Sequence, residues 1–367
     1  MTQTNDLQVK LDELKTHKLP TGVLGVASDK ASWNAGEGRI FAACMDGGIY
    51  QCSPDSGDFE KLTSHKSYAS GVAAPDTLQA DIVSAGYDGR LLWTSAGDRS
   101  VRHDVKAHNF WSWKLKASAD GRMVASASGQ YLSGGYKYEP APEQEPSVKV
   151  YERGSARLLH AFSHLPPVLS VAFSPDNRFL AAGNMMGDVK VWDLQTGEIY
   201  REWNTPDFTS WGVIKSHHYI GGIFDLCFTP DSTGVLCCGM GPMRDPMAGN
   251  GRQTWQLFDI STGEVEKKLE IKDDQRGRGL MEAIAFHPSG SFFVMAGRLA
   301  QGQWNLACFN PQSGENIHNI NTKDRITSID FSPDGRILVL GGATGQGGKK
   351  DGQWPHYGRI RTFSVQM

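Results

Sequence analysis

One pattern of apolar and polar positions recurs along most of this chain. Its clearest copy occupies residues 168–198, where three short apolar runs are separated by turns that contain Pro, Asp, Asn and Gly. In that copy Val171 and Phe173 lie two positions apart, and a period of two is typical of a half-buried strand. Similar copies begin at Ile223, Met281 and Ile326. Each copy predicts three strands joined by two turns.

The turns indicate how many copies the chain holds. The turn after the first strand carries an acidic residue, or a serine in one copy, at Asp29, Asp76, Asp120, Asp176, Asp231, Ser289 and Asp334. A later turn, before a fourth strand, carries a glycine at Gly57, Gly97, Gly197, Gly263 and Gly314. Glycine adopts a positive φ at the lowest cost, which suits such turns. The seven turns of the first kind predict seven units of four strands.

These residues resemble the WD40 repeat, and the resemblance covers nearly all of the chain. It implies an all-β fold, a seven-bladed β-propeller of four-stranded antiparallel blades, in a single domain over residues 1–367. It also implies that the ring closes with a strand from the opposite end of the chain. Residues 7–15 have the pattern of an unattached strand, and residues 358–367 supply only a third strand. We expect these two segments to pair, because pairing removes an exposed sheet edge.

The same resemblance implies a hydrogen-bonded chain of His, Ser or Thr, Asp and Trp within a blade. Blade two carries the most complete set, His65, Ser84, Asp88 and Trp93, although Trp93 lies one position closer to the aspartate than the family spacing. A buried chain of this kind stabilises a fold only when every member finds its partner. We therefore assign these four residues to a structural network.

Long insertions occur at one kind of position in the repeat. They lie between second and third strands, or before a first strand, at residues 129–146, 239–252, 297–304, 341–357 and 204–218. In a propeller these connections open on the same side, and the loops of the opposite side stay near family length. Extra residues on one face of a repeat fold commonly mark a binding face. The sequence therefore predicts that one face surrounds the central channel with binding loops.

Aromatic and arginine residues are concentrated in these segments and in the shorter connections beside them. We predict a partner-binding set of Tyr68, Phe110, Trp111, Trp113, Tyr131, Tyr136, Trp211, Arg244, Arg276, Arg278, Trp304, Arg325 and Trp354. Tyr, Trp and Arg dominate the energetics of protein interfaces. Any single aromatic residue of the set has a second reading as a cap between blades, and any single arginine as the partner of a nearby carboxylate.

Composition narrows the classes of partner. The formal net charge is −3 and the pI is near 6.4, so the chain has no general attraction for nucleic acid or an anionic membrane. The first residues hold no apolar run of signal-peptide length, and we expect a cytoplasmic protein. Six cysteines without zinc-site spacing are expected to be buried thiols, with a Cys44–Cys52 bond as a minor alternative. Partners are thus expected to be proteins or peptides.

The sequence contains neither a Gly-x-Ser-x-Gly motif nor a His-Glu-x-x-His motif. Residues 341–350 are rich in glycine, but Ala343 and Lys350 occupy positions that a phosphate-binding loop requires to be Gly and Ser or Thr. We therefore favour a non-enzymatic scaffold without a cofactor. The alternative is a small-molecule or metal-binding propeller enzyme at the channel mouth, with Asp225, Glu282, Asp324 and Asp330 as candidate ligands. A third possibility is a structural subunit of a larger assembly.

Overall fold

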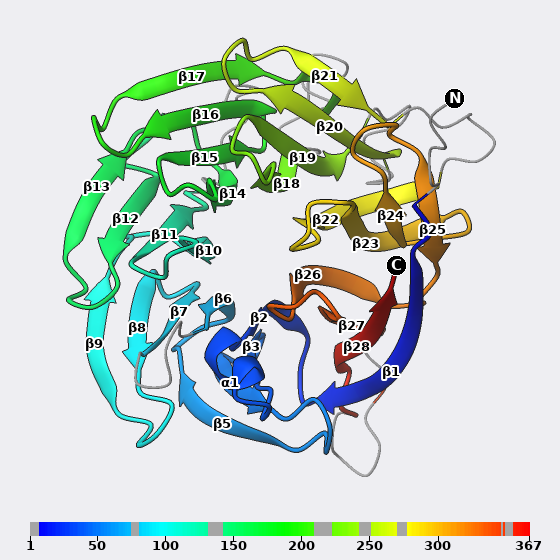
Figure 1. The fold of residues 1–367 in the computed structure, drawn as a ribbon. Helices are drawn as coiled ribbons and strands as arrows, with labels where there is room; N and C mark the ends of the chain where they lie inside the picture. Colours follow the sequence, from blue (N-terminus) through cyan, green and yellow to red (C-terminus); the bar gives the residue numbers. More distant parts are fainter. Residues whose placement is uncertain are drawn as a thin grey trace.

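Seven four-stranded antiparallel sheets form a closed ring in this computed structural model (Figure 1). The structure describes residues 7–74, 81–130, 142–208, 222–241, 251–269, 277–345, 348 and 355–367. Among these residues the helical elements are one short α-helix, α1 (Lys30–Asn34), and one 3₁₀ turn, η1 (Pro206–Phe208). The all-β fold and the seven blades predicted from the sequence are confirmed.

The first three blades follow the chain in order, each strand pairing with the next. Blade one comprises β2 (Val23–Ser28), β3 (Ile40–Cys44), β4 (Gly48–Cys52) and β5 (Phe59–Ser64). Blade two comprises β6 (Ala69–Ala73), β7 (Ile82–Gly86), β8 (Arg90–Thr94) and β9 (Val101–Lys106). Blade three comprises β10 (Ser112–Ala117), β11 (Met123–Ser128), β12 (Val148–Glu152) and β13 (Leu158–Phe162).

The next three blades repeat this order. Blade four comprises β14 (Val168–Phe173), β15 (Phe179–Asn184), β16 (Asp188–Asp193) and β17 (Ile199–Asn204). Blade five comprises β18 (Gly222–Phe228), β19 (Gly234–Met240), β20 (Gln253–Asp259) and β21 (Val265–Lys268). Blade six comprises β22 (Arg278–Phe286), β23 (Phe293–Gln301), β24 (Leu306–Phe309) and β25 (Asn316–Ile320).

Blade seven contains both ends of the described chain. It comprises β26 (Arg325–Phe331), β27 (Ile337–Ala343), β28 (Gly358–Gln366) and, as its outer strand, β1 (Lys10–Leu19). Strand β1 pairs antiparallel with β28 from Lys10 opposite Gln366 to Leu19 opposite Gly358. The predicted closure is therefore confirmed, with the borrowed strand starting a few residues later than the sequence pattern suggested.

A cluster of charges reinforces this closure. The Arg361 guanidinium on β28 donates to Glu13 of β1 at 2.8 and 2.9 Å and to Asp324, before β26, at 2.7 Å. Arg361 is largely buried beside these carboxylates. Its hydrogen bonds therefore join the N-terminal strand β1 to β28 and to the residue before β26.

The hydrophobic core lies between the blades. One cluster combines Met281 and Phe293 of blade six with Leu236 and Trp255 of blade five, and another combines blade six with β26, β27, β28 and β1. Each blade therefore buries both of its faces against neighbours, as apolar residues on successive strands require.

The turns after the first strands share one hydrogen-bonding scheme. In blade four the Ser174 hydroxyl donates to Asp176 at 2.5 Å, and Asp176 accepts from the Arg178 N–H at 3.0 Å. The turns also touch across blades, since the Asp176 N–H donates to the Ser232 hydroxyl at 3.3 Å. This explains why an acidic residue recurs at this place in the repeat.

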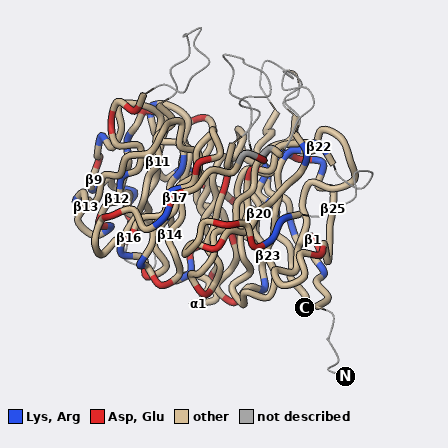
Figure 2. The backbone as a smooth tube through the Cα atoms, turned by 90° about the horizontal axis from the view of Figure 1, so that it is seen from above, with Lys and Arg blue, Asp and Glu red and all other residues tan. Residues whose placement is uncertain are grey.

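Blade one departs from this scheme and corrects one expectation. Asp29 accepts from the N–H groups of Ala31 and Ser32 at 3.1 and 3.2 Å and so caps α1. We call the face carrying α1 and these turns the bottom face, and the face carrying the connections between second and third strands the top face (Figure 2). The bottom loop of blade one is thus lengthened, contrary to the expectation that the loops of this face stay short.

Two further expectations are corrected. Residues 297–304 were expected to form a loop, but β23 continues to Gln301 and pairs Leu299 with Gly279 of β22. Cys44 lies opposite Val23 and Cys52 opposite Ile40, so these two cysteines do not face each other across strands. All six cysteines are free thiols, and burial raises the pKa of Cys52 to about 12.

Strand β1 offers a test of ring closure. Leu11 is 6% exposed and packs in the core, whereas Leu14 on the same strand is 56% exposed. We expect Leu11→Ala to lower the free energy of unfolding by about 2–4 kcal/mol and Leu14→Ala to change it by less than about 0.5 kcal/mol. Deletion of residues 1–15 should lower the melting temperature much further. Thermal melts followed by circular dichroism would contradict the closure if the deletion left the melting curve unchanged.

Candidate functional site

Three of the predicted binding residues meet on the top face. Tyr68 precedes β6, Trp111 precedes β10, and Trp113 lies on β10. Tyr87, which the sequence did not single out, lies against all three. Its ring stacks on Trp111 (centroids 5.0 Å apart, 7° between planes) and on Trp113 (5.5 Å, 21°), and Tyr68 lies 5.6 Å away. We call Tyr68, Tyr87, Trp111 and Trp113 the aromatic cluster.

The outer members of the aromatic cluster are open to solvent. Tyr68 is 44% exposed and Trp111 is 46% exposed, which are high values for aromatic rings. Tyr87 lies beneath them, and burial raises its pKa to about 12, so its hydroxyl stays neutral. The stack holds two exposed rings in fixed positions, and fixed rings lose little entropy when a partner covers them.

A cavity of about 220 Å³ lies beside the aromatic cluster at the top end of the channel. Tyr68, Tyr87 and Trp113 line one side of it, and Phe224 of blade five contributes to the lining. Further lining residues come from blades one, six and seven, so six of the seven blades contribute. The shape of this cavity therefore depends on the closed ring.

Two ion pairs border the cavity. Arg325 donates to Glu282 through Nε at 2.7 Å and through Nη2 at 2.8 Å, a bidentate pair between blades seven and six. Lys114 of blade three lies 3.1 Å from Asp225 of blade five, so this pair passes the inner strand of blade four. Burial raises the pKa of Glu282, although Arg325 opposes that rise. The Arg325 side chain remains half exposed.

The candidate metal ligands have separate partners. Asp225 and Glu282 pair with Lys114 and Arg325 as described, and Asp324 pairs with Arg361. Asp330 accepts the Ser28 N–H at 2.6 Å and the Phe331 N–H at 2.9 Å. Over the part of the chain that the structure describes, no group of three His, Cys, Asp or Glu residues could hold a metal ion.

The remaining predicted binding residues fall into three groups. Phe110 is partly buried beside Trp111, and Arg278 is exposed at the start of β22. The prediction that Trp304 belongs to the binding surface is wrong. Its side chain is only 5% exposed and packs against Phe309 in the core between blades five and six. Six predictions lie outside the described residues: Tyr131, Tyr136, Trp211, Arg244, Arg276 and Trp354.

A hydrogen-bond network supports the aromatic cluster from blade two. His65 contacts Ser84 through Nε2 at 2.9 Å and Asp88 through Nδ1 at 3.1 Å. Asp88 also accepts the N–H groups of Lys66 and Arg90 at 2.9 and 3.1 Å. Burial opposes ionisation of Asp88, but these donors outweigh it and lower its pKa to about 2. The network fixes the turn that carries Tyr87.

Trp93 does not join this network, which corrects the assignment made from the sequence. Its indole N–H donates to the Arg153 carbonyl of blade three at 2.7 Å, and its ring meets Tyr151 edge-on. In blade four Trp192 instead stacks on Phe162, which lies behind it in blade three. A shift of one residue along a strand turns a side chain to the opposite face, so the early position of Trp93 directs it to the following blade.

Blade three builds a related network with a different acid. His108 contacts the Ser126 hydroxyl at 3.1 Å, and burial lowers the pKa of His108 to about 3. Glu145, near the end of the long insertion, accepts the Asn109 N–H at 2.7 Å, as Asp88 accepts that of Lys66. The sequence did not reveal this role, because Glu145 lies outside the repeat pattern.

Seven four-stranded blades with a shared axis define the chain as a β-propeller. The family model described as "WD domain, G-beta repeat" (WD40) matches residues 156–193 and 314–347, which cover parts of blades three, four, six and seven. With the seven blades, these matches show that the chain is a WD40-repeat seven-bladed β-propeller.

Curated relatives match over part of their length. Protein HIR1 of Yarrowia lipolytica is 25% identical over 281 residues, which cover 71% of this chain and 23% of the relative. Protein HIR1 of Eremothecium gossypii is 23% identical over 207 residues (53% and 22%), and Protein HIR1 of Candida albicans is 24% identical over 198 residues (49% and 20%). The chain thus spans less than a quarter of the length of these relatives.

Among the described residues, no helix is long and apolar enough to cross a membrane. Neither α1 nor η1 approaches the length and apolar character that a bilayer-crossing helix needs.

Asp88 gives a pH-dependent test of the network. Its folded pKa of about 2 lies below the ordinary value of 3.8, so its stabilising effect is complete above about pH 4 and disappears as the pH falls through 2. We expect Asp88→Asn to cost about 1–2 kcal/mol at neutral pH, and the difference from the wild type to shrink between pH 4 and pH 2. Chemical denaturation across this pH range measures the difference in the free energy of unfolding between Asp88→Asn and the wild type. Asp58→Asn, at an exposed position, is the control, and a constant difference at all pH values would contradict the network.

Proposed function

We propose that this chain is a non-enzymatic scaffold that binds a protein or peptide segment on its top face. The observation that carries the proposal is the pair of exposed rings, Tyr68 and Trp111, held beside a cavity that six blades line. Exposed aromatic residues that surround a preformed pocket are typical of binding hot spots. The general role of WD40 propellers as interaction scaffolds supports the same reading.

The geometry suggests how such a segment would be held. Trp111 and Tyr68 would cover apolar side chains of the partner and supply most of the affinity. Arg325 uses Nε and Nη2 for Glu282, which leaves Nη1 without a hydrogen bond to a described residue. It would orient a carbonyl or carboxylate of the partner through a charge-assisted hydrogen bond.

The alternative of a metal-binding or small-molecule enzyme has weaker support. Each of the four carboxylates considered for it is held by its own amine, guanidinium or backbone N–H. We also propose, from composition alone, that the partner is neither nucleic acid nor membrane and that the chain acts in the cytoplasm.

Affinity capture with a matched pair of variants tests the top-face proposal. Tyr68→Ala combined with Trp111→Ala removes both exposed rings, while Tyr200→Ala removes a ring that is 39% exposed on the outer strand β17. We expect proteins captured by the wild type to fall about tenfold or more with the double variant and to persist with Tyr200→Ala. Quantitative mass spectrometry of the captured proteins measures the change.

Thermal melts of the same variants separate binding from folding, because both changed rings lie at the surface. Equal recovery of the same companions by the wild type and a folded double variant would overturn the proposal. A stoichiometric, tightly held divalent cation in the purified protein would favour the enzyme alternative instead.

A further inference from the structure

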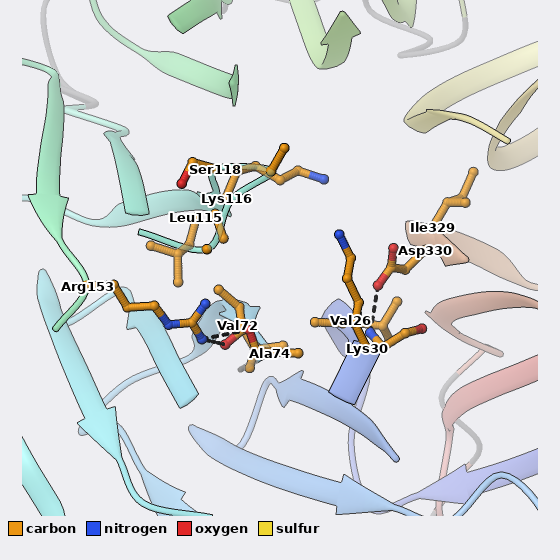
Figure 3. A pocket seen from close by; sticks show the side chains of 16 residues that line it. Val26, Lys30, Val72, Ala74, Leu115, Lys116, Ser118, Arg153, Ile329 and Asp330 are labelled. Atoms are coloured by element: carbon orange, nitrogen blue, oxygen red, sulfur yellow. Dashed lines mark hydrogen bonds between the residues drawn. The ribbon is translucent and has the colours of Figure 1, made fainter. Parts of the chain in front are cut away.

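A second cavity lies at the opposite end of the channel, on the bottom face (Figure 3). It holds about 200 Å³ and is lined from blades one, two, three and seven. Lys30 comes from α1, Lys116 from β10 and Asp330 from β26, and all three point toward the open middle of the ring (Figure 3). None of these residues belongs to the top-face site.

The accessible charge of this cavity is positive. Lys30 is exposed and Lys116 is partly buried, and neither forms a salt bridge with a described residue. Arg153 also lines the cavity, but it directs its guanidinium to the carbonyls of Ala73, Ala74 and Asp81 at 3.2, 2.6 and 2.9 Å. Asp330 is the carboxylate that opposes the lysines, and both of its oxygens already accept backbone N–H groups. Burial raises the pKa of Asp330, although these N–H groups oppose that rise.

A buried hydroxyl without a described hydrogen-bond partner lies beside the cavity. Ser28 lines the cavity and is only 3% exposed, yet its Oγ has no hydrogen-bond partner among the described residues. A buried hydroxyl without a partner costs about 1–3 kcal/mol unless another group satisfies it. Because the Ser28 Oγ has almost no accessible surface, a ligand in the cavity would not reach it.

The rest of the wall is apolar and made of small residues. Val26, Val72, Leu115 and Ile329 line it together with several alanines. At roughly 30 Å³ per water molecule, the volume corresponds to a ligand of about seven non-hydrogen atoms. The walls favour a short aliphatic stem, and the two lysines favour an anionic oxygen group at its end.

We propose that this bottom cavity binds a carboxylate on a short aliphatic stem, with Lys30 and Lys116 pairing with the carboxylate. The ligand is either a free short-chain carboxylic acid or the side chain of a glutamate in a partner segment. This site is independent of the top-face proposal, so either can fail without the other.

Titrations with defined probes test the site. Butyrate, glutarate and a glutamate blocked at both ends are titrated into the full chain and followed by ligand-detected NMR. We expect at least one of them to bind saturably and to weaken about tenfold or more in Lys30→Met and in Lys116→Met. Lys18→Met, which removes an exposed lysine of β1, is the charge-matched control and should bind as the wild type does.

A variant that gains affinity guards against loss of folding. Asp330→Asn removes the opposing carboxylate and should strengthen binding at least about twofold. Saturable binding of butyrate or glutarate indicates a free acid as the ligand, and binding of the blocked glutamate alone indicates a peptide side chain. Absence of saturable binding by all three probes, or binding that neither lysine substitution weakens, would overturn the proposal.

Discussion

Pairing of β1 with β28 is the constraint on which the rest of the molecule depends. A propeller buries its apolar residues between blades, so blade seven can pack against blade one only when its outer strand is supplied from the far end of the sequence. The top cavity takes residues from six blades and the bottom cavity from four. Neither could keep its shape in an open array, because the lining residues of blades one and seven would separate.

The repeat pattern predicted the fold well because its physical basis is local. Alternating apolar residues and Ser-Pro-Asp turns each specify a strand or a hairpin without reference to distant residues, so seven blades and the closing strand followed. Side-chain direction was harder to predict. Trp93 differs from the family position by one residue and faces another blade, and Trp304 was read as a loop residue although β23 extends toward it and its indole packs in the core.

The candidate site was predicted only in part, for a related reason. Tyr68, Trp111 and Trp113 lie in or next to connections that the sequence identified, but what joins them is Tyr87, in a short turn without an insertion. An aromatic residue in a tight top-face turn, next to an aromatic-rich connection of the following blade, is the signal that could have identified it. The bottom cavity had no such signal, because Ser28, Lys30, Lys116 and Asp330 are far apart in sequence and ordinary in their repeats.

The ion pair between Lys114 and Asp225 has a consequence for how the blades communicate. Repeat proteins are usually described as chains of units in which each unit senses only its immediate neighbours. This pair joins blades three and five directly across blade four, with both side chains largely buried. It introduces a next-nearest-neighbour energy, so a perturbation in blade three reaches blade five without first loosening the blade between them.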